Sequence, residues 1–489
     1  MGFLHKNSEI VKSITDSSDS RYINVLYISK KPSYLTAFSG KGKKKMKIKI
    51  TRIVEHAIAA VVIFCSGCSS SPEKISNIEV NEEIKKTSSE SVEFSGSEEI
   101  QNLDLSYPVV DTGQSTCYDE MNAIDCPQSG EAFSGQDAQY SGSTPQYRDN
   151  GDGTISDLVT ELMWQKSADL NNDGEINASD KLTYKEALSK SESLSLAGYD
   201  DWRLPSIKEM YSLILFTGTD PSGWTGIDTS KLAPFIDEIF DFGYGDTTSG
   251  ERIIDAQFAS GTKYVSTTMN GAETMFGVNF ADGRIKGYGL DHPGGEKKFY
   301  VLYVRGNTTY GIDSFRDNGN GTVTDIATGL TWMQADSGRG MVWAEALAYC
   351  ENLDYSGRND WRLPNIKELQ SIVDYNRSPD TSGTASIDPV FEITEIVDEI
   401  KEPDYPYFWS STTHANLRNG GNSAYISFGR AMGKMNGIWM DVHGAGAQRS
   451  DPKNGDPDTW PDGHGPQGDA IRIENFARCV SGGIGQDID

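Results

Sequence analysis

The pattern of apolar and polar residues changes between strand-like and helix-like spacing along this chain, and the same succession of patterns occurs twice. An alternating stretch around Asn-Gly and Asp-Gly pairs, at 147–157 and again at 315–325, predicts a β-hairpin. A short apolar strand, two helices and a run of short strands follow in each half. This order predicts an α+β fold rather than a doubly wound sheet, in two copies over residues 147–306 and 312–483. The expected elements are strands at 162–165 and 330–333, first helices at 184–194 and 343–353, second helices at 207–215 and 366–375, strands at 264–268 and 408–412 that we align with each other, strands near Phe280 and Phe428, and closing strands at 300–305 and 476–481.

The clearest repeat is a nine-residue phrase at the start of each second helix. Residues 201–209 and 360–368 differ at one position, which is Ser in the first copy and Asn in the second. The proline keeps the residue before it extended, and Ser or Asn followed three residues later by Glu forms a capping box. The phrase therefore predicts a turn into a helix. We expect Arg203 and Arg362 to pair with a carboxylate near that helix start, with contact to a ligand as the alternative.

The charge is distributed unevenly over the 489 residues, a length with room for two or three domains. Residues 1–67 hold 12 of the 44 Lys and Arg and 4 of the 71 Asp and Glu. The remainder therefore holds 32 basic and 67 acidic side chains, a net charge of −35. An acidic body of this kind excludes nucleic acid and other polyanions as expected partners, and it suits an exported protein that meets divalent cations.

The basic excess lies before an apolar run at 57–64 and the sequence Cys-Ser-Gly-Cys. This is the layout of a secretory signal peptide, predicted over residues 46–67. The small residues before Cys68 resemble a bacterial lipobox, which implies that Cys68 is acylated and anchors the mature protein to a membrane. An ordinary cleaved signal or a short anchor is the alternative, although the run is short for a bilayer span.

Three further expectations follow from this leader. The residue after Cys68 is Ser rather than Asp, which is typical of lipoproteins sorted to the outer membrane, so the protein is expected in the cell envelope. Met46 is a candidate translation start, because secretory signals begin close to their basic region. Residues 68–108 are rich in Ser, Glu and Lys and poor in aromatic residues, which predicts a disordered tether.

A lead-in segment, residues 109–146, separates the tether from the first copy. Cys117 and Cys126 bracket a short polar loop within it. In an exported protein two cysteines this close predict a disulfide, with two free thiols as the alternative. Two cysteines without a neighbouring histidine or further cysteine do not indicate a zinc site.

Several phrases in the two copies resemble one known family, the C-terminal domain of Legionella collagen-like adhesins. These phrases are DNGDGT at 149–154, TELMWQ at 160–165, WRLPSIKE at 202–209, FWSST at 408–412 and RCV at 478–480. The turn into the helix is also similar to that of C-type-lectin-like and sulfatase-modifying folds. The resemblance implies a compact mixed sheet with two flanking helices in each copy. It also implies a glycan ligand and a role in adhesion. Neither copy has the paired catalytic cysteines of the formylglycine-generating enzymes, so an enzyme is disfavoured.

The second copy has two cysteines that the first copy lacks. Cys350 lies in its first helix and Cys479 in its last strand, where the alignment places Ser191 and Tyr303 in the first copy. Joint presence and joint absence predict a mutual disulfide, with two buried free thiols as the alternative. C-type-lectin-like folds also tie their first helix to their last strand.

The first copy has an insertion of nine residues that resembles an EF-hand calcium loop. Oxygen-bearing residues recur at the spacing of the calcium ligands, which are hard oxygens from side chains, carbonyls and water. Gly174 stands where the loop turns sharply, and Ile176 is expected to pin the loop to the core. A polar surface loop is the alternative to a structural Ca²⁺ site. The candidate ligands are Asp169, Asn171, Asp173, Glu175, Asn177 and Asp180.

Other polar segments give weaker indications of metal binding. The acidic turns at 149–157 and 317–325 are interpreted first as hairpins and second as weak metal sites. His443 and His464, near a long Gly- and Pro-rich loop at 441–469, are the candidates for a transition-metal patch. Long loops often carry binding functions.

These patterns favour an exported, lipid-anchored envelope protein that binds a ligand through two lectin-like domains. The resemblance indicates a glycan as that ligand. The alternative is a structural or protein-interaction module of the envelope without lectin activity. An enzyme is the least favoured class, because the six histidines are scattered and no catalytic set occurs at a recognisable spacing.

Overall fold

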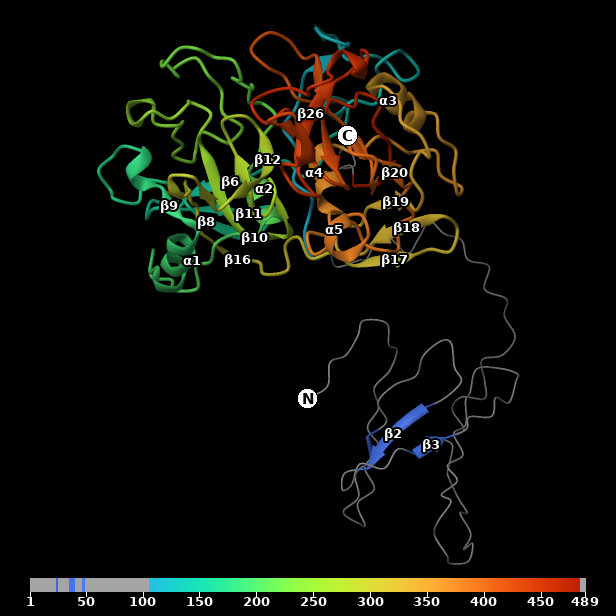
Figure 1. Ribbon diagram of the computed structural model, residues 1–489, viewed down its shortest axis with the longest axis horizontal. Coiled ribbons are helices and arrows are strands. Elements are labelled where there is room, and N and C mark those ends of the chain that lie inside the picture. The colour runs from blue at the N-terminus through green and yellow to red at the C-terminus, as the bar shows by residue number, and fades with distance from the viewer. Residues whose placement is uncertain (1–22, 25–34, 40–45, 49–104, 484–489) are drawn as a thin grey trace, which may run out of the picture. The chain divides into compact units, whose positions relative to one another are not determined.

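The computed structural model describes residues 23–24, 35–39, 46–48 and 105–483 (Figure 1). The chain divides into two compact units, Met1–Phe94 and Ser95–Asp489. In the first unit, β1 (Ile23–Asn24), β2 (Leu35–Ser39) and β3 (Met46–Ile48) form one small sheet. Residues 49–67 of the predicted signal peptide, and residues 68–104 of the predicted tether with Cys68, lie outside the described residues. Among the helices that are described, none has the length and apolar character needed to cross a membrane.

The second unit is an α+β structure made mostly of short strands, which confirms the expected class. The first copy contains β6 (Tyr147–Asp149), β7 (Thr154–Asp157), β8 (Leu162–Gln165), β9 (Leu182–Thr183), α1 (Tyr184–Ser193), α2 (Ile207–Ser212), β10 (Gln257–Thr268), β11 (Ala272–Asn279), β12 (Arg284–Gly289), β13 (Asp291–His292), β14 (Gly295–Glu296), β15 (Lys298–Phe299) and β16 (Val304–Gly306). The second contains β17 (Phe315–Asp317), β18 (Thr322–Asp325), β19 (Thr331–Met333), α3 (Trp343–Glu351), α4 (Ile366–Ser371), α5 (Pro379–Ser382), β20 (Ile396–Val397), β21 (Pro403–Asp404), β22 (Tyr407–Thr413), β23 (Asn422–Ser427), β24 (Met432–Met435), β25 (Ile438–Asp441), β26 (Gln448–Pro452) and β27 (Val480–Ser481). The lead-in contributes β4 (Cys117–Tyr118) and β5 (Ala123–Ile124).

One six-stranded sheet runs through both copies. Its order is β10-β11-β12-β26-β23-β22, so three strands of the first copy continue into three strands of the second (Figure 1). The junction is the pairing of Ile285 in β12 with Gln448 in β26. A single hydrophobic core contains buried side chains from both copies, including Phe276 and Ile426. The two copies therefore share a sheet and a core, and each leaves its outermost strand, β10 or β22, at an edge.

Each copy also has a four-stranded sheet formed by its hairpin. The orders are β16-β8-β7-β6 and β17-β18-β19-β27, and the predicted hairpins β6–β7 and β17–β18 are both present. The strands named here pair antiparallel, and the parallel pairing that a mixed sheet requires is limited to isolated bridges such as Phe258–Tyr300 and Phe408–Phe476. The second helices, α2 and α4, end three or four residues earlier than predicted.

The predicted loop at 441–469 contains a central strand of the shared sheet. β26 pairs with β23 over five residues and with β12 at one. The prediction of a long loop was wrong here, because glycine and proline flank a segment whose neighbouring strands satisfy its backbone. Sequence spacing does not reveal such pairing, since both partners are distant in the chain.

The alignment of Tyr264–Thr268 with Phe408–Thr412 was wrong by six residues. The amide of Ile207 donates to Thr262 Oγ1 at 3.0 Å, and the amide of Ile366 donates to Thr412 Oγ1 at 3.0 Å. The hydroxyl of Ser260 donates to a carbonyl of the neighbouring strand, as that of Ser410 does. The stretch equivalent to 408–412 is therefore 258–262, at the beginning of β10.

Candidate functional site

The repeated phrase forms a capping box and an ion pair in both copies. Ser206 and Asn365 cap α2 and α4, with Glu209 and Glu368 completing the boxes. Arg362 makes two hydrogen bonds of 2.6 Å to Glu368, and Arg203 pairs with Glu209. The prediction of a carboxylate partner near the helix start is confirmed. These arginines support the helix starts.

The insertion of the first copy folds as a tight loop with the predicted turn. Gly174 has a φ of 87°, in the left-handed region that favours glycine. The carboxylate of Asp169 accepts hydrogen bonds from the amides of Asn172 and Gly174, at 2.7 and 2.9 Å. Ile176 packs against the core, as expected, with its side chain against Gly243.

The oxygens of this loop are used mainly by its own backbone. Asp180 is buried and accepts from the amides of Leu170, Asn171 and Asn177. The side-chain amide of Asn171 donates to the Asp173 carboxylate at 3.0 Å, and the backbone amide of Glu175 donates to the same carboxylate at 2.9 Å. Across the described part of the chain, no group of three or more His, Cys, Asp or Glu side chains is placed to hold a metal ion. The turn and the oxygen donors fit a calcium loop, whereas the carboxylates do not converge, and calcium binding stays a prediction.

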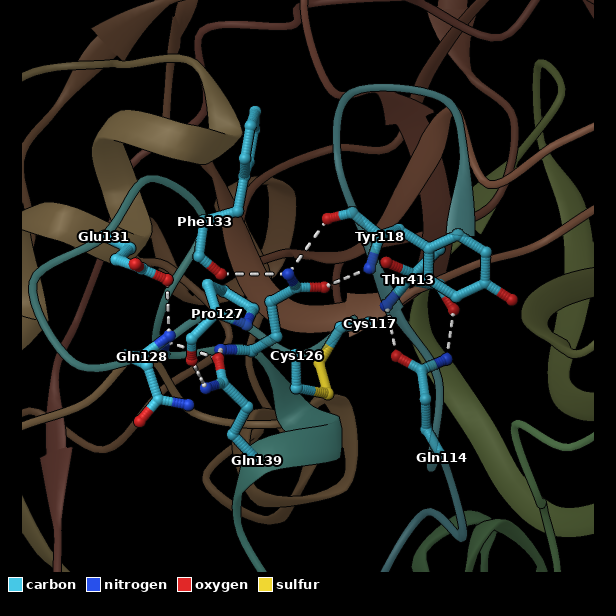
Figure 2. The surroundings of a disulfide bond; sticks show 12 residues. Gln114, Cys117, Tyr118, Cys126, Pro127, Gln128, Glu131, Phe133, Gln139 and Thr413 are labelled. Carbon is cyan, nitrogen blue, oxygen red and sulfur yellow. Dashed lines mark hydrogen bonds between the residues drawn. A yellow bond between two sulfur atoms is a disulfide. The ribbon is translucent and has the colours of Figure 1, made fainter. Parts of the chain in front are cut away.

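The Cys117–Cys126 disulfide is formed and lies in the lead-in (Figure 2). Its strand β4 pairs with β5, and the Gln136 side chain bonds to the backbone of Tyr118 in both directions, at 2.9 Å. The lead-in packs against the second copy. There Asp137 is buried and accepts from the hydroxyls of Thr112 and Thr412, and burial raises its pKa to about 7.

The Cys350–Cys479 disulfide is also formed, and it joins α3 to the residue before β27. In the first copy a hydrogen bond takes its place. The hydroxyl of Tyr303 donates to the carbonyl of Ala187 in α1 at 2.9 Å, and this contact is buried. Both copies therefore tie their first helix to their closing segment, one covalently and one through a tyrosine.

A groove of about 300 Å³ opens beside α1 on the first copy. Its floor includes Tyr184 and Leu188 of α1, and Lys263 of β10 pairs with Glu273 of β11 at its side. The other lining residues are Thr183, Lys185, Leu290, Asp291 and Glu296. Sequence reasoning missed this site, and the one available signal was Leu188, a large apolar residue that is exposed on a mostly polar helix.

The chain matches one protein-family model in both of its copies. The Lcl C-terminal domain matches residues 153–305 and 321–440, which together are more than half of the chain. The chain belongs to the Lcl C-terminal domain family. No match to the chain was found among curated proteins or solved structures.

The first Lcl C-terminal segment contains the 169–180 loop and the groove, so both lie within the family domain. The second segment ends at residue 440, before β26 and Cys479. The strand that joins the two copies and the second disulfide therefore lie beyond the matched residues.

The two Lcl C-terminal segments contact each other through the lysines of the repeated phrase. Lys208 donates to the Ser371 carbonyl at the end of α4, and Lys367 donates to the Ser212 carbonyl at the end of α2. Lys208 also pairs with Asp313 at 2.7 Å. Lys367 is buried, and burial lowers its pKa to about 7. The phrase thus links the copies as well as starting their helices.

The two histidines proposed as a transition-metal patch have different surroundings. His443 is buried, and its Nε2 lies 2.9 Å from Asp469. Burial lowers the pKa of His443 well below its usual value, so the ring is neutral. His464 is exposed and packs edge-on against Trp460. This pair forms no metal-binding cluster among the described residues.

Proposed function

We propose that this protein is an exported, lipid-anchored binding protein of a bacterial cell envelope, with a glycan as its ligand and Ca²⁺ as a structural ion. Its membership of the Lcl C-terminal domain family supports a binding role. The lipid at Cys68 would hold the protein at the outer membrane. The proposed function includes no catalytic step.

Export is supported by the two disulfides. Both tie parts of the second unit together, one within the lead-in and one across 129 residues of the second copy. Disulfides of this kind persist outside the reducing cytoplasm. We therefore place the folded unit outside the cytoplasm, and the two disulfides are the observation that supports this part of the proposal.

A glycan array probed with the purified, calcium-loaded protein tests the ligand. We expect a small set of glycans to bind, and we expect a chelator to abolish these signals if the calcium loop supports the binding surface. A silent array would contradict the glycan, and the structural or protein-interaction role would then replace it. Protein in which both disulfides have been reduced and alkylated is applied to the same array and serves as the misfolded control.

Calcium binding is tested separately by isothermal titration calorimetry. We expect one saturable binding event per chain, because the loop from Asp169 to Asp180 supplies oxygen donors at calcium spacing. The double variant Asp169→Ala/Asp173→Ala is expected to abolish this heat, whereas Asp200→Ala, at an exposed aspartate outside the loop, should leave it unchanged. Equal heats from the double variant and the unaltered protein would contradict the site.

The alternative is a protein-interaction module of the envelope without lectin activity. The groove beside α1 favours it, because an apolar floor beside an exposed strand edge is a surface that polypeptide segments bind. An array without hits, together with a saturable protein ligand, would support this alternative.

A further inference from the structure

The groove on the first copy corresponds residue by residue to a surface of the second copy. Equivalent positions follow from equivalent hydrogen bonds. The amide of Leu290 donates to the Glu273 carbonyl, and the amide of Lys453 donates to the Gly421 carbonyl, each at 2.9 Å between adjacent strands. Equivalent residues in the two copies are therefore Leu290 and Lys453, Glu273 and Gly421, Lys263 and Thr413, Tyr184 and Trp343, and Leu188 and Leu347.

In the second copy this surface is covered by the lead-in. The side chain of Gln114 bonds to the edge strand β22 in both directions, accepting from the Thr413 amide at 2.9 Å and donating to its carbonyl at 2.7 Å (Figure 2). Phe133 stacks on Trp343 with ring centroids 6.4 Å apart. An amide side chain thus pairs with the strand edge while an aromatic ring covers the helix.

Lys453 completes this contact between the lead-in and the second copy. Its Nζ lies 3.8 Å from the ring centre of Trp343 and 5.2 Å from that of Tyr118. It also donates to the Asp119 carbonyl at 3.1 Å. Burial in this position lowers the pKa of Lys453 to about 6. The covered surface is therefore a closely packed intramolecular interface.

The same surface on the first copy is open. Leu347 is fully buried, whereas its equivalent Leu188 is 39 % exposed. All seven residues of β22 are buried, whereas Gly261 and Lys263 of β10, the equivalents of Ser411 and Thr413, are exposed. An exposed strand edge beside an apolar groove is a site for pairing with another chain.

We propose that this groove binds an extended segment of another protein in the way that the second copy holds the lead-in. The segment pairs with the edge of β10 at Lys263 and places an apolar or aromatic side chain on Tyr184 and Leu188. Asp291 and Glu296, both exposed on the β13–β14 hairpin, favour a basic residue beside it. The contact between the lead-in and the second copy shows how a segment fits this type of surface. The expected ligand therefore resembles the lead-in.

Selection of random peptides displayed on phage against the purified full chain tests this proposal. We expect enriched peptides to contain an aromatic residue, and we expect the synthetic peptides to bind in fluorescence anisotropy titrations. Leu188→Glu should weaken this binding at least tenfold, because it places a charge on the apolar floor. In hydrogen exchange, the bound peptide should protect amides of β10 between Lys263 and Thr267.

Leu158→Glu is the matched control, because Leu158 is also an exposed leucine of the first copy, at 52 %, and does not line the groove. The Leu158→Glu variant should bind the peptides with the same affinity as the unaltered protein. Leu188→Ala gives a second measurement if Leu188→Glu fails to fold, and it should also weaken binding. The proposal is overturned if no peptide is enriched above background, if both groove variants bind like the control, or if the glycan signals of the array are lost in Leu188→Ala.

Discussion

Replacing Cys350 and Cys479 together by alanine is expected to lower the free energy of unfolding by about 5 kcal/mol in the chain-entropy account. The reason is the length of the closed loop, since the two cysteines are 129 residues apart and the disulfide removes many conformations from the unfolded chain. Both residues are fully buried in the core of the second copy. Guanidinium unfolding without reductant, followed by tryptophan fluorescence, measures the difference.

The other disulfide is the internal control for this prediction. Cys117 and Cys126 are 9 residues apart, so the same account gives a loss of about 2.5 kcal/mol for their double alanine variant. Loop length alone therefore predicts that the long-range bridge has the larger effect. If the short bridge proves as important as the long one, packing of the lead-in on the second copy, rather than loop closure, dominates its contribution.

Arg362→Ala is expected to destabilise the protein by about 3–5 kcal/mol, because it leaves a buried carboxylate without its partner. The side chains of Arg362 and Glu368 are 4 % and 6 % exposed, and two hydrogen bonds of 2.6 Å join them. Glu368 also accepts from the Asn365 amide at the start of α4. Urea or guanidinium unfolding at neutral pH measures the loss.

The same phrase in the first copy supplies a matched variant. The side chain of Arg203 is 30 % exposed, so water can solvate Glu209 after Arg203→Ala, and a loss of about 1 kcal/mol is expected. The double variant Arg362→Met/Glu368→Gln should recover part of the stability lost in Arg362→Ala, since it removes the unpaired charge and keeps the helix cap. Equal losses for Arg203→Ala and Arg362→Ala would show that burial of the second pair has no energetic weight.

Local features of the fold were predictable from short stretches of sequence. The capping boxes of α2 and α4 and the hairpins β6–β7 and β17–β18 depend on residues within a few positions of one another. The long disulfide was also predictable, although its cysteines are far apart, because comparison of the copies shows both cysteines present or both absent. The internal repeat thus supplied long-range information of a kind that a single domain sequence lacks.

Pairing between distant strands was not predictable in the same way. The alignment of 264–268 with 408–412 failed because both stretches contain an aromatic residue followed by Ser and Thr. The hydrogen bonds of Thr262 and Ser260 identify the correct position. β26 was missed because glycine and proline surround it in sequence, while its partners β12 and β23 come from two different copies.

For the calcium loop, the sequence indicated the turn at Gly174 and the oxygen donors, but the backbone partners of Asp180 depend on how the loop closes.

Residue identities alone were enough to predict two related α+β copies, their family and the pairing of the cysteines. These properties follow from residue identities and from comparison of the copies with each other. The shared sheet, and the lead-in that covers the second copy while the first keeps an open groove at Leu188, became apparent from the fold alone. Equivalent residues such as Leu188 and Leu347 are identical in the sequence, and their exposure differs because the lead-in covers this surface in the second copy and leaves it open in the first.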